Sequence, residues 1–459
     1  RASQWMEENI PLFECSQKNF EEMYYYRWWT LRKHIKETPV GYGMTEFLVN
    51  RSYADKYNLI ACAIGHHIYE SRWLRNPEYL NQIIHTWYRG NEGGPMAKMT
   101  KFSSWNADAV LGRYMVDGNK EFLLDMVKDL EAEYARWEKT NRLSNGLYWQ
   151  GDVQDGMEES ISGGRRKQYA RPTINSYMYG NAKALSLIGI MTGDEGMAMK
   201  YGLKADSIKT LVQDKLWNTD HHFFETMRGD ASAEVREAIG YIPWYFNLPD
   251  ASSQYDVAWK EVMDEKGFSA PYGLTTAERR HPEFRTHGVG KCEWDGAIWP
   301  FASAQTLTAM ANFMNNYPQT VLTDSVYFHQ MERYVESQHH RGRPYIGEYL
   351  DEVTGYWLKG DQERSRYYNH STFNDLMITG LIGLRPRMDN TVEVNPLIPE
   401  GKWDYFCLDN VLYHGRNLTI LWDKDGSRYQ RGKGLHIYVD GKEVGHADTL
   451  TRVLCENVL

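Results

Sequence analysis

The chain has 459 residues, of which 42% are hydrophobic and 25% are charged, so it is long enough for a large core and more than one domain. Its net charge of −9 and its pI near 6.0 argue against nucleic acid or an anionic membrane surface as a partner. No apolar run approaches the roughly 20 residues that a membrane-spanning helix requires.

Between about residues 17 and 385, apolar residues recur at the i, i+3, i+4 spacing of amphipathic helices. This spacing predicts about eleven helices separated by loops that contain Gly, Pro, Asn and Asp. They are Asn19–Lys36, Tyr53–Trp73, Pro77–Tyr88, Trp105–Met115, Lys120–Thr140, Thr173–Thr192, Glu195–Leu216, Ser252–Val262, Gly296–Asn315, Gln319–Gln338 and Ser371–Ile382. No fixed-period repeat is visible, which disfavours an open solenoid. The pattern therefore favours a closed toroid of helical hairpins.

The character of the sequence changes near residue 386, where short segments alternate apolar and polar residues as strands do. The predicted strands are Thr391–Val394, Asn410–Tyr413, Leu418–Trp422 and Leu435–Val439. Asp425-Gly426 and Asp440-Gly441 supply residues that favour hairpin turns. We therefore expect two units, a helical domain over residues 1–385 and a small β-sandwich-like module over residues 386–459.

A first acidic loop, Gly146–Ser160, follows the predicted helix that ends at Thr140. Its acids are Asp152, Asp155, Glu158 and Glu159. Such a loop is usually a solvated surface segment, but Trp149 and Met157 place apolar bulk among these acids. Desolvation of a carboxyl raises its pKa toward the range of a proton donor, so we interpret the loop as a candidate catalytic segment.

A second loop, Tyr345–Trp357, places Glu348 between two tyrosines before a Thr-Gly turn. A third segment, Trp294-Asp-Gly-Ala-Ile-Trp-Pro-Phe301, opens a predicted helix. Trp149, Asp152, Trp294, Asp295, Trp299, Tyr345 and Trp357 are the candidate substrate-binding residues. The alternative is that most of these tryptophans only fill the core. Carboxyls beside aromatic rings fit the cleavage of a sugar–sugar bond, because one acid protonates the leaving oxygen while another activates water or attacks the anomeric carbon.

The order of these segments resembles that of the (α/α)6 glycoside hydrolases related to family 63 and the trehalases, and in particular their bacterial mannosylglycerate-hydrolase-like relatives. The resemblance covers nearly the whole chain and implies a mainly α fold, an (α/α)6 toroid followed by a small C-terminal β module. Asp155-Gly-Met-Glu158 matches the motif of the general acid, and Glu348 before Thr354-Gly355 matches the general base. Glu158 replaces the family's Asp, so the acid is either Glu158 or Asp155.

The resemblance implies an inverting, exo-acting hydrolase of an α-linked sugar, active in polysaccharide degradation, whose partner is an oligosaccharide or glycoside. Alternatives are a phosphorylase or polysaccharide lyase on the same toroid, or a non-catalytic glycan-binding protein. No organic cofactor is implied, and the cysteines contain no C-x-x-C pair that would indicate zinc. A structural Ca²⁺ would suit the acidic loops, although no D-x-D-x-D-G loop supports it. Because the chain starts at Arg1 without Met, as a mature product does, we expect a periplasmic or secreted location.

Overall fold

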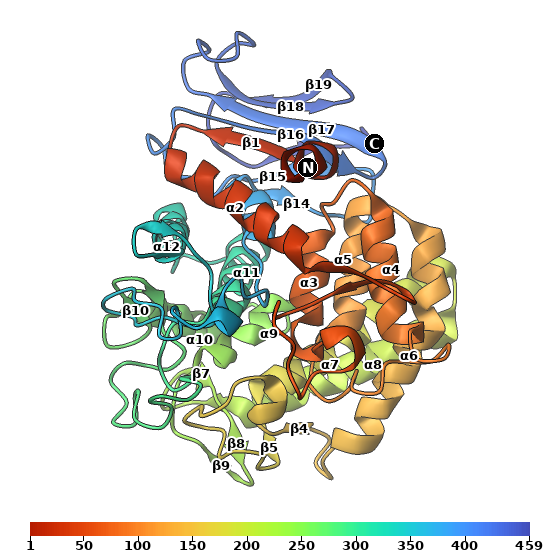
Figure 1. The fold of residues 1–459 in the computed structure, drawn as a ribbon, viewed down its shortest axis with the longest axis vertical. Coiled ribbons are helices and arrows are strands. Elements are labelled where there is room, and N and C mark those ends of the chain that lie inside the picture. The colour runs from red at the N-terminus through yellow and green to blue at the C-terminus, as the bar shows by residue number, and fades with distance from the viewer.

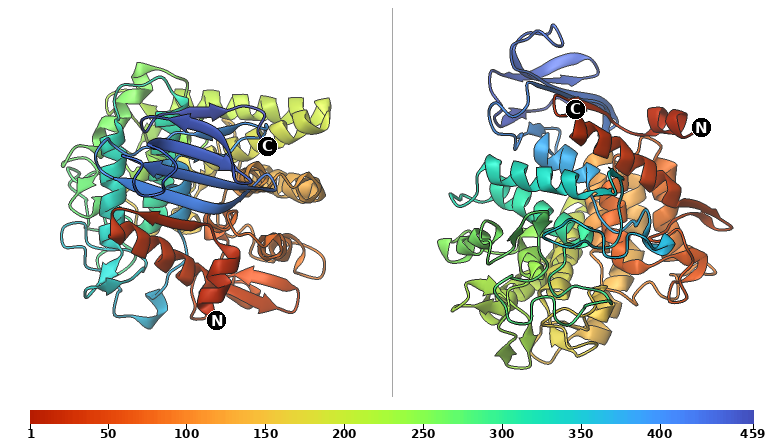
Figure 2. Two further views of the ribbon diagram at one scale, coloured as in Figure 1. Left: turned by 90° about the horizontal axis from the view of Figure 1, so that it is seen from above. Right: turned by 60° about the vertical axis from the view of Figure 1, so that its left-hand side comes forward.

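The computed structural model describes residues 1–459 and shows a ring of helices with a β module seated on one end (Figure 1). The predicted mainly α architecture is confirmed. Seen from above, the strands of the module lie across that end of the ring (Figure 2). None of the helices combines the length and the apolar character that crossing a membrane would require.

Six helices form the inner ring. They are α3 (Ile64–Ser71), α5 (Asn106–Asp117), α7 (Pro172–Thr192), α9 (Ile242–Tyr245), α11 (Pro300–Asn316) and α13 (Asn374–Leu376). Each contacts the next in this order, and α13 contacts α3. The last inner helix therefore closes the ring on the first, which excludes an open solenoid.

Six further helices alternate with the inner ones along the chain and lie outside them. They are α2 (Lys18–His34), α4 (Pro77–Arg89), α6 (Lys120–Asn141), α8 (Glu195–Leu211), α10 (Ser253–Asp256) and α12 (Asp324–Ser337), and a short α1 (Ala2–Asn9) precedes them. Burial separates the two rings. The inner α7 is covered almost all round, whereas α8 buries only Met197, Tyr201, Ala205 and Ile208, a single stripe at helical spacing.

The longest departure from the predicted helices is at Tyr53–Trp73, where only Ile64–Ser71 is α-helical. Tyr57 and Asn58 both adopt the left-handed region, each with φ of 62°, which ends any regular helix there. The Asn58 side chain accepts the backbone N–H of Arg51 and donates to the carbonyl of Phe47. These side-chain bonds to the backbone favour a loop, so the single long helix was wrong.

The β module is a five-stranded antiparallel sheet in the order β1-β16-β17-β18-β19 beside the three-stranded β14-β15-β20. Its strands are β1 (Leu12–Cys15), β14 (Leu384–Arg385), β15 (Val392–Val394), β16 (Tyr405–Tyr413), β17 (Arg416–Asp423), β18 (Gly434–Val439), β19 (Lys442–Ala447) and β20 (Val453–Cys455). Asp440-Gly441 forms the predicted two-residue turn, whereas residues 424–433 form a longer loop. The edge strand β1 comes from the other end of the chain, and the division at residue 385 stays a prediction.

Short β-hairpins lie within the connections that lead from an outer helix to the next inner helix. They are β2 (Ile35–Thr38), β3 (Gly41–Met44), β4 (Trp149–Gln150), β5 (Tyr169–Ala170), β6 (Trp217–Asn218), β7 (Phe223–Phe224), β8 (Met227–Arg228), β9 (Ala231–Ser232), β10 (Ser269–Ala270), β11 (Gly273–Leu274), β12 (His339–His340) and β13 (Arg343–Pro344). Because the two rings run antiparallel, all these connections reach the end of the toroid where the inner helices begin. Figure 1 shows β4, β5, β8 and β9 at the end away from the module.

Candidate functional site

Four connections bring the candidate residues to this end of the toroid. Glu46 lies between α2 and α3, Glu158 between α6 and α7, Trp299 immediately before α11, and Glu348 between α12 and α13. The charges of Glu158 and Glu348 both act on the Glu46 carboxyl. Residues far apart in the sequence thus meet because each precedes an inner helix of the same ring.

Glu158 is a half-buried carboxyl without a side-chain hydrogen-bond partner. Burial, reinforced by the negative charges of Asp152 and Glu348, raises its pKa to about 7, while Lys359 opposes the shift. A carboxyl with this pKa keeps its proton close to neutral pH. Glu158 therefore has the environment that a general acid requires.

Glu348 is 4% exposed, and three neighbouring side chains surround its carboxyl group. Ser365 donates its hydroxyl to Glu348 Oε1 over 2.7 Å, Arg364 NH2 lies 3.5 Å from the same oxygen, and Lys359 Nζ lies 3.6 Å from Oε2. Gly347 is required beside it, because a Cβ there would lie 2.8 Å from Tyr345 and 3.0 Å from Trp357. The loop thus presents a fixed carboxylate whose negative charge is balanced by two cations.

Glu46 is a third carboxyl of the site and was not predicted. It is 2% exposed and accepts the Tyr368 hydroxyl over 2.9 Å. The Cys62 thiol lies 3.6 Å from its Oε1, and His370 Nδ1 lies 3.9 Å from the same oxygen. Burial raises the pKa of Glu46 to about 8. Its sequence context, a lone acid between Thr45 and Phe47, carries no motif that would have revealed it.

Aromatic rings form a wall of the same site. Trp294 and Trp299 stack with their centroids 4.6 Å apart, and Trp299 stacks on Tyr349 at 4.5 Å. His370 approaches Trp299 at 6.0 Å, which joins this stack to the surroundings of Glu46. The buried Nε1 of Trp294 has no hydrogen-bond partner. The predicted pair of tryptophans therefore does lie together, and Tyr349 extends it.

The three aspartates among the candidates are occupied in holding loops. Asp155 accepts from Arg171 Nε at 2.7 Å, from Thr173 at 2.6 Å, and from Ser103. Asp152 Oδ1 accepts the backbone N–H of Val153, and Asp295 Oδ2 accepts the backbone N–H groups of His287 and Gly288. All three are 1% exposed or less. Each fastens a segment that carries other site residues.

Two further tryptophan candidates lie outside the aromatic stack. Trp357 is 1% exposed, donates its Nε1 to the carbonyls of Ser337 and His339, and packs with Tyr345. Trp149 lies on hairpin β4–β5, half-buried, opposite Ala170. The structure brings neither Trp149 nor Trp357 into the stack with Trp299.

The side chains of His221, Glu225 and Glu234 lie close enough to hold a metal ion, with ligand atoms within 4.8 Å of one another. Glu225 already accepts from Asn218 and Ser232 and pairs with His221 at 2.5 Å. The Glu225 carboxylate therefore already has hydrogen-bond partners within this cluster.

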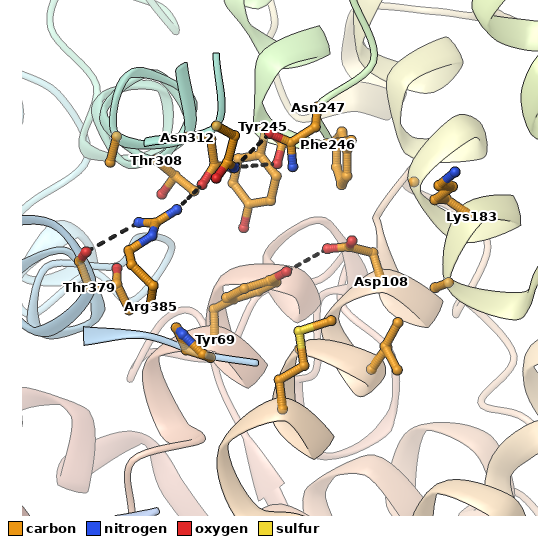
Figure 3. Close-up of a pocket in the computed structure, with 18 of the residues that line it drawn as sticks. Tyr69, Asp108, Lys183, Tyr245, Phe246, Asn247, Thr308, Asn312, Thr379 and Arg385 are labelled. Carbon is orange, nitrogen blue, oxygen red and sulfur yellow. Dashed lines mark hydrogen bonds between the residues drawn. The ribbon is translucent and has the colours of Figure 1, made fainter. Parts of the chain in front are cut away.

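A cavity of about 600 Å³ occupies the opposite end of the ring. Figure 3 shows Tyr69, Asp108, Lys183, Tyr245 and Arg385 around it. These residues come from inner helices and from the strand that enters the module, and neither Glu158 nor Glu348 lines this cavity.

Two family models match the chain. One, described as mannosylglycerate hydrolase MGH1-like glycoside hydrolase domain, covers residues 56–371. The other, the C-terminal domain of glycosyl hydrolase family 65, covers residues 384–446. The first spans the connections that carry Glu158, Trp294, Trp299 and Glu348.

Solved structures show the same fold. One named "Sialidase" is 84% identical over the whole chain, with a TM-score of 0.99, and this chain spans 42% of its length. A GH63 mannosylglycerate hydrolase from Thermus thermophilus, in complex with glucose, is 11% identical, with a TM-score of 0.57 over 78% of this chain and 99% of that one. A GH78 rhamnosidase from a Bacillus species is also 11% identical, with a TM-score of 0.58 over 91% of this chain and 40% of that one.

Proposed function

Because the chain belongs to the mannosylglycerate hydrolase MGH1-like glycoside hydrolases, we propose that it cleaves a glycosidic bond with inversion of configuration, using Glu158 as acid and Glu348 as base. The observation that carries this assignment is the unequal surroundings of the two carboxyls. Glu158 is desolvated and unpartnered, with a pKa of about 7, whereas Glu348 is held by Ser365 and faces Lys359 and Arg364. Two carboxyls with opposite environments suit the roles of proton donor and base.

In this reaction Glu158 donates its proton to the glycosidic oxygen as the bond to the anomeric carbon breaks. Glu348 removes a proton from a water molecule that attacks the same carbon from the opposite face. The hydroxyl of Ser365 fixes one oxygen of Glu348, and Lys359 lies 3.6 Å from the other. Trp299 is stacked between Trp294 and Tyr349, and none of the three is more than 3% exposed, so they form a packed apolar wall of the site and not an open platform for a sugar ring.

Exo-action and an α linkage complete the proposal. Glu46, Trp299 and Glu348 are all less than 5% exposed, and such depth favours entry of a chain end over a lengthwise fit of a long polymer. The α linkage follows the family resemblance and relatives with this fold, among them an α-L-rhamnosidase from Aspergillus terreus.

The test is a panel of aryl glycosides and oligosaccharides with α and β linkages, sialosides included, in which NMR identifies the first anomer released. We expect a single terminal sugar with inverted configuration. A retained anomer would refute inversion, and internal fragments would refute exo-action. Turnover that requires inorganic phosphate would indicate the phosphorylase, an unsaturated product absorbing in the ultraviolet would indicate the lyase, and binding without release from any substrate would indicate the glycan-binding protein.

A further inference from the structure

A groove of about 780 Å³ is lined in part by residues within 340–345 and 360–367, which flank Glu348 and include neighbours of its partners in the sequence. We name it the arginine groove and define it by Tyr26, Trp29, Arg343, Tyr345, Arg366 and Tyr367, which line it. Tyr345 lies three residues before Glu348. Tyr367 directly precedes Tyr368, which binds Glu46.

The groove presents aromatic surface. Trp29 lies 5.9 Å from Tyr26 and 5.4 Å from Tyr367, centroid to centroid. All three rings are partly exposed. Flat, partly exposed aromatic rings are the surfaces on which the C–H faces of sugars stack, and they lose little conformational freedom on binding because they are already packed on one side.

Tyr367 is held in place at a conformational cost. Its φ is 63°, in the left-handed region that is strained for a non-glycine residue. The backbone N–H of Tyr367 donates to the carbonyl of Ile346 over 3.0 Å, and its carbonyl bonds to His34 Nε2 at 2.5 Å. Two bonds thus fix a strained residue whose ring lines the groove.

Both signs of charge line the groove, since Asp361 and Glu363 lie in it beside three arginines, Arg341, Arg343 and Arg366. Arg343 and Arg366 are exposed, and neither forms an ion pair, whereas the neighbouring Arg341 pairs with Asp361 at 2.9 Å. Outside the lining, the Lys33 ammonium lies 3.9 Å from the Trp29 ring, and within it the Arg366 guanidinium lies 4.7 Å from the Tyr367 ring. In addition, the Tyr345 hydroxyl, on a residue only 7% exposed, has no hydrogen-bond partner. The lining therefore offers cations and a free hydroxyl to an anionic, hydroxylated ligand.

We propose that the arginine groove is a second carbohydrate site, which binds a carboxylated saccharide such as a uronic acid unit of a glycan. Trp29 and Tyr367 contact the sugar rings, and Arg343 and Arg366 pair with the carboxylate. An acidic peptide would satisfy the same arginines, but it would not use the aromatic faces in the same way. The site holds a glycan beside the catalytic loops without taking part in the cleavage.

The test is direct binding, measured by isothermal titration calorimetry, so it does not depend on turnover. The probes are the disaccharides of galacturonic, glucuronic and mannuronic acid, the neutral disaccharides of galactose, glucose and mannose, and triglutamate. The Glu348→Gln variant serves as the host protein, which prevents hydrolysis. We expect at least one uronic acid disaccharide to bind about ten-fold more tightly than its neutral counterpart, and added salt to weaken it.

Variants then locate the site. Replacing Arg343 and Arg366 together by Gln should weaken uronic acid binding at least about ten-fold, because two charged contacts are lost. Trp29→Ala should weaken it as well, and Trp29→Phe, which keeps a ring, should retain most of the affinity. Arg431→Gln is the matched control, since Arg431 is also an exposed arginine near an aromatic ring, that of Tyr438 in the β module.

Three outcomes would overturn the proposal. They are the failure of every uronic acid disaccharide to bind, equal affinity for acidic and neutral disaccharides, and unchanged affinity in the double arginine variant. Equal or tighter binding of triglutamate would show that the groove recognises acidic peptides instead. Loss of the proposed hydrolysis leaves all these results untouched, so the two proposals fail independently.

Discussion

Asp155 and Glu158 are three residues apart in one loop, yet their surroundings are opposite. Asp155 is fully buried and accepts from Arg171, Thr173 and Ser103. Glu158 is half-buried, and no side chain hydrogen-bonds to it. Burial raises the pKa of both carboxyls, but for Asp155 the charge of Arg171 and the hydrogen bonds of Ser103 and Thr173 oppose that rise. A buried carboxylate with hydrogen bonds and a cation beside it stabilises the fold. A carboxyl without such partners has a raised pKa and can act as a proton donor.

Asp295 and Glu348 differ in the kind of group that holds them. Asp295 Oδ2 is taken up by two backbone N–H groups of its neighbouring loop. Glu348 Oε1 receives the Ser365 hydroxyl and faces Arg364 at 3.5 Å, and its Oε2 faces Lys359 at 3.6 Å. Substitutions in the two classes of carboxyl should therefore give different signatures.

The largest effect is expected from Glu158→Gln and Glu348→Gln, each of which removes a proton-transfer group. Both should lower kcat by at least about 10²-fold. On a dinitrophenyl glycoside, whose leaving group needs no protonation, Glu158→Gln should recover to within about ten-fold of wild type, and Glu348→Gln should not. Initial rates on the two substrates measure this. If only Glu348→Gln recovered its rate on the dinitrophenyl glycoside, Glu348 would be the acid and Glu158 the base.

Asp155→Asn is expected to act on stability. Removing one partner of a buried ion pair leaves Arg171 uncompensated and should cost about 3–5 kcal/mol in the free energy of unfolding. Glu158→Gln, by contrast, replaces an unpartnered acid and should cost little. Urea denaturation of both variants measures the difference. A stable Asp155→Asn that loses its activity would instead favour Asp155 as the acid.

The pH profile is expected to report Glu158. Its pKa of about 7 lies above the ordinary 4.5, so the protonated form required of an acid is present below this pH and is lost as the pH rises through it. The rate should then fall about ten-fold per pH unit on the alkaline side. Profiles of kcat/KM with an ordinary aryl glycoside test this. The decrease of kcat/KM on the alkaline side should be absent for Glu158→Gln on the dinitrophenyl glycoside.

Glu46→Gln is expected to have the smallest effect on kcat near neutral pH. Burial raises the pKa of Glu46 to about 8, and Gln resembles the neutral form of this carboxyl. A raised carboxyl pKa makes the folded state bind more protons than the unfolded one, so wild-type stability falls as the pH rises from the ordinary 4.5 toward 8. The variant lacks this loss and should gain stability relative to wild type over that range. Thermal unfolding of the wild type and the variant across this pH range gives the comparison. If the stabilities of the two proteins changed in parallel with pH, the prediction would be wrong.

Most of the architecture could be predicted from the sequence because helices of both rings carry apolar residues at helical spacing. Thr173–Thr192 was predicted and Pro172–Thr192 was found, since Pro at the first turn and Gly193 with φ of 74° mark the ends locally. The four-residue α9 and the edge strand β1 escaped prediction. Both are too short to show a period, and tertiary contacts decide their conformation.

By itself the sequence determined a toroid of hairpins with a β module and two acidic loops beside Trp and Tyr, because periodicity, turn residues and motif order are local properties. Only the tertiary structure shows that Glu158 and Asp155 have different surroundings, since the partners of Asp155 include Ser103 from another connection. It alone placed Glu46 beside Tyr368, 322 residues away. Desolvation and compensation depend on which segments meet, and that is settled only when the ring closes.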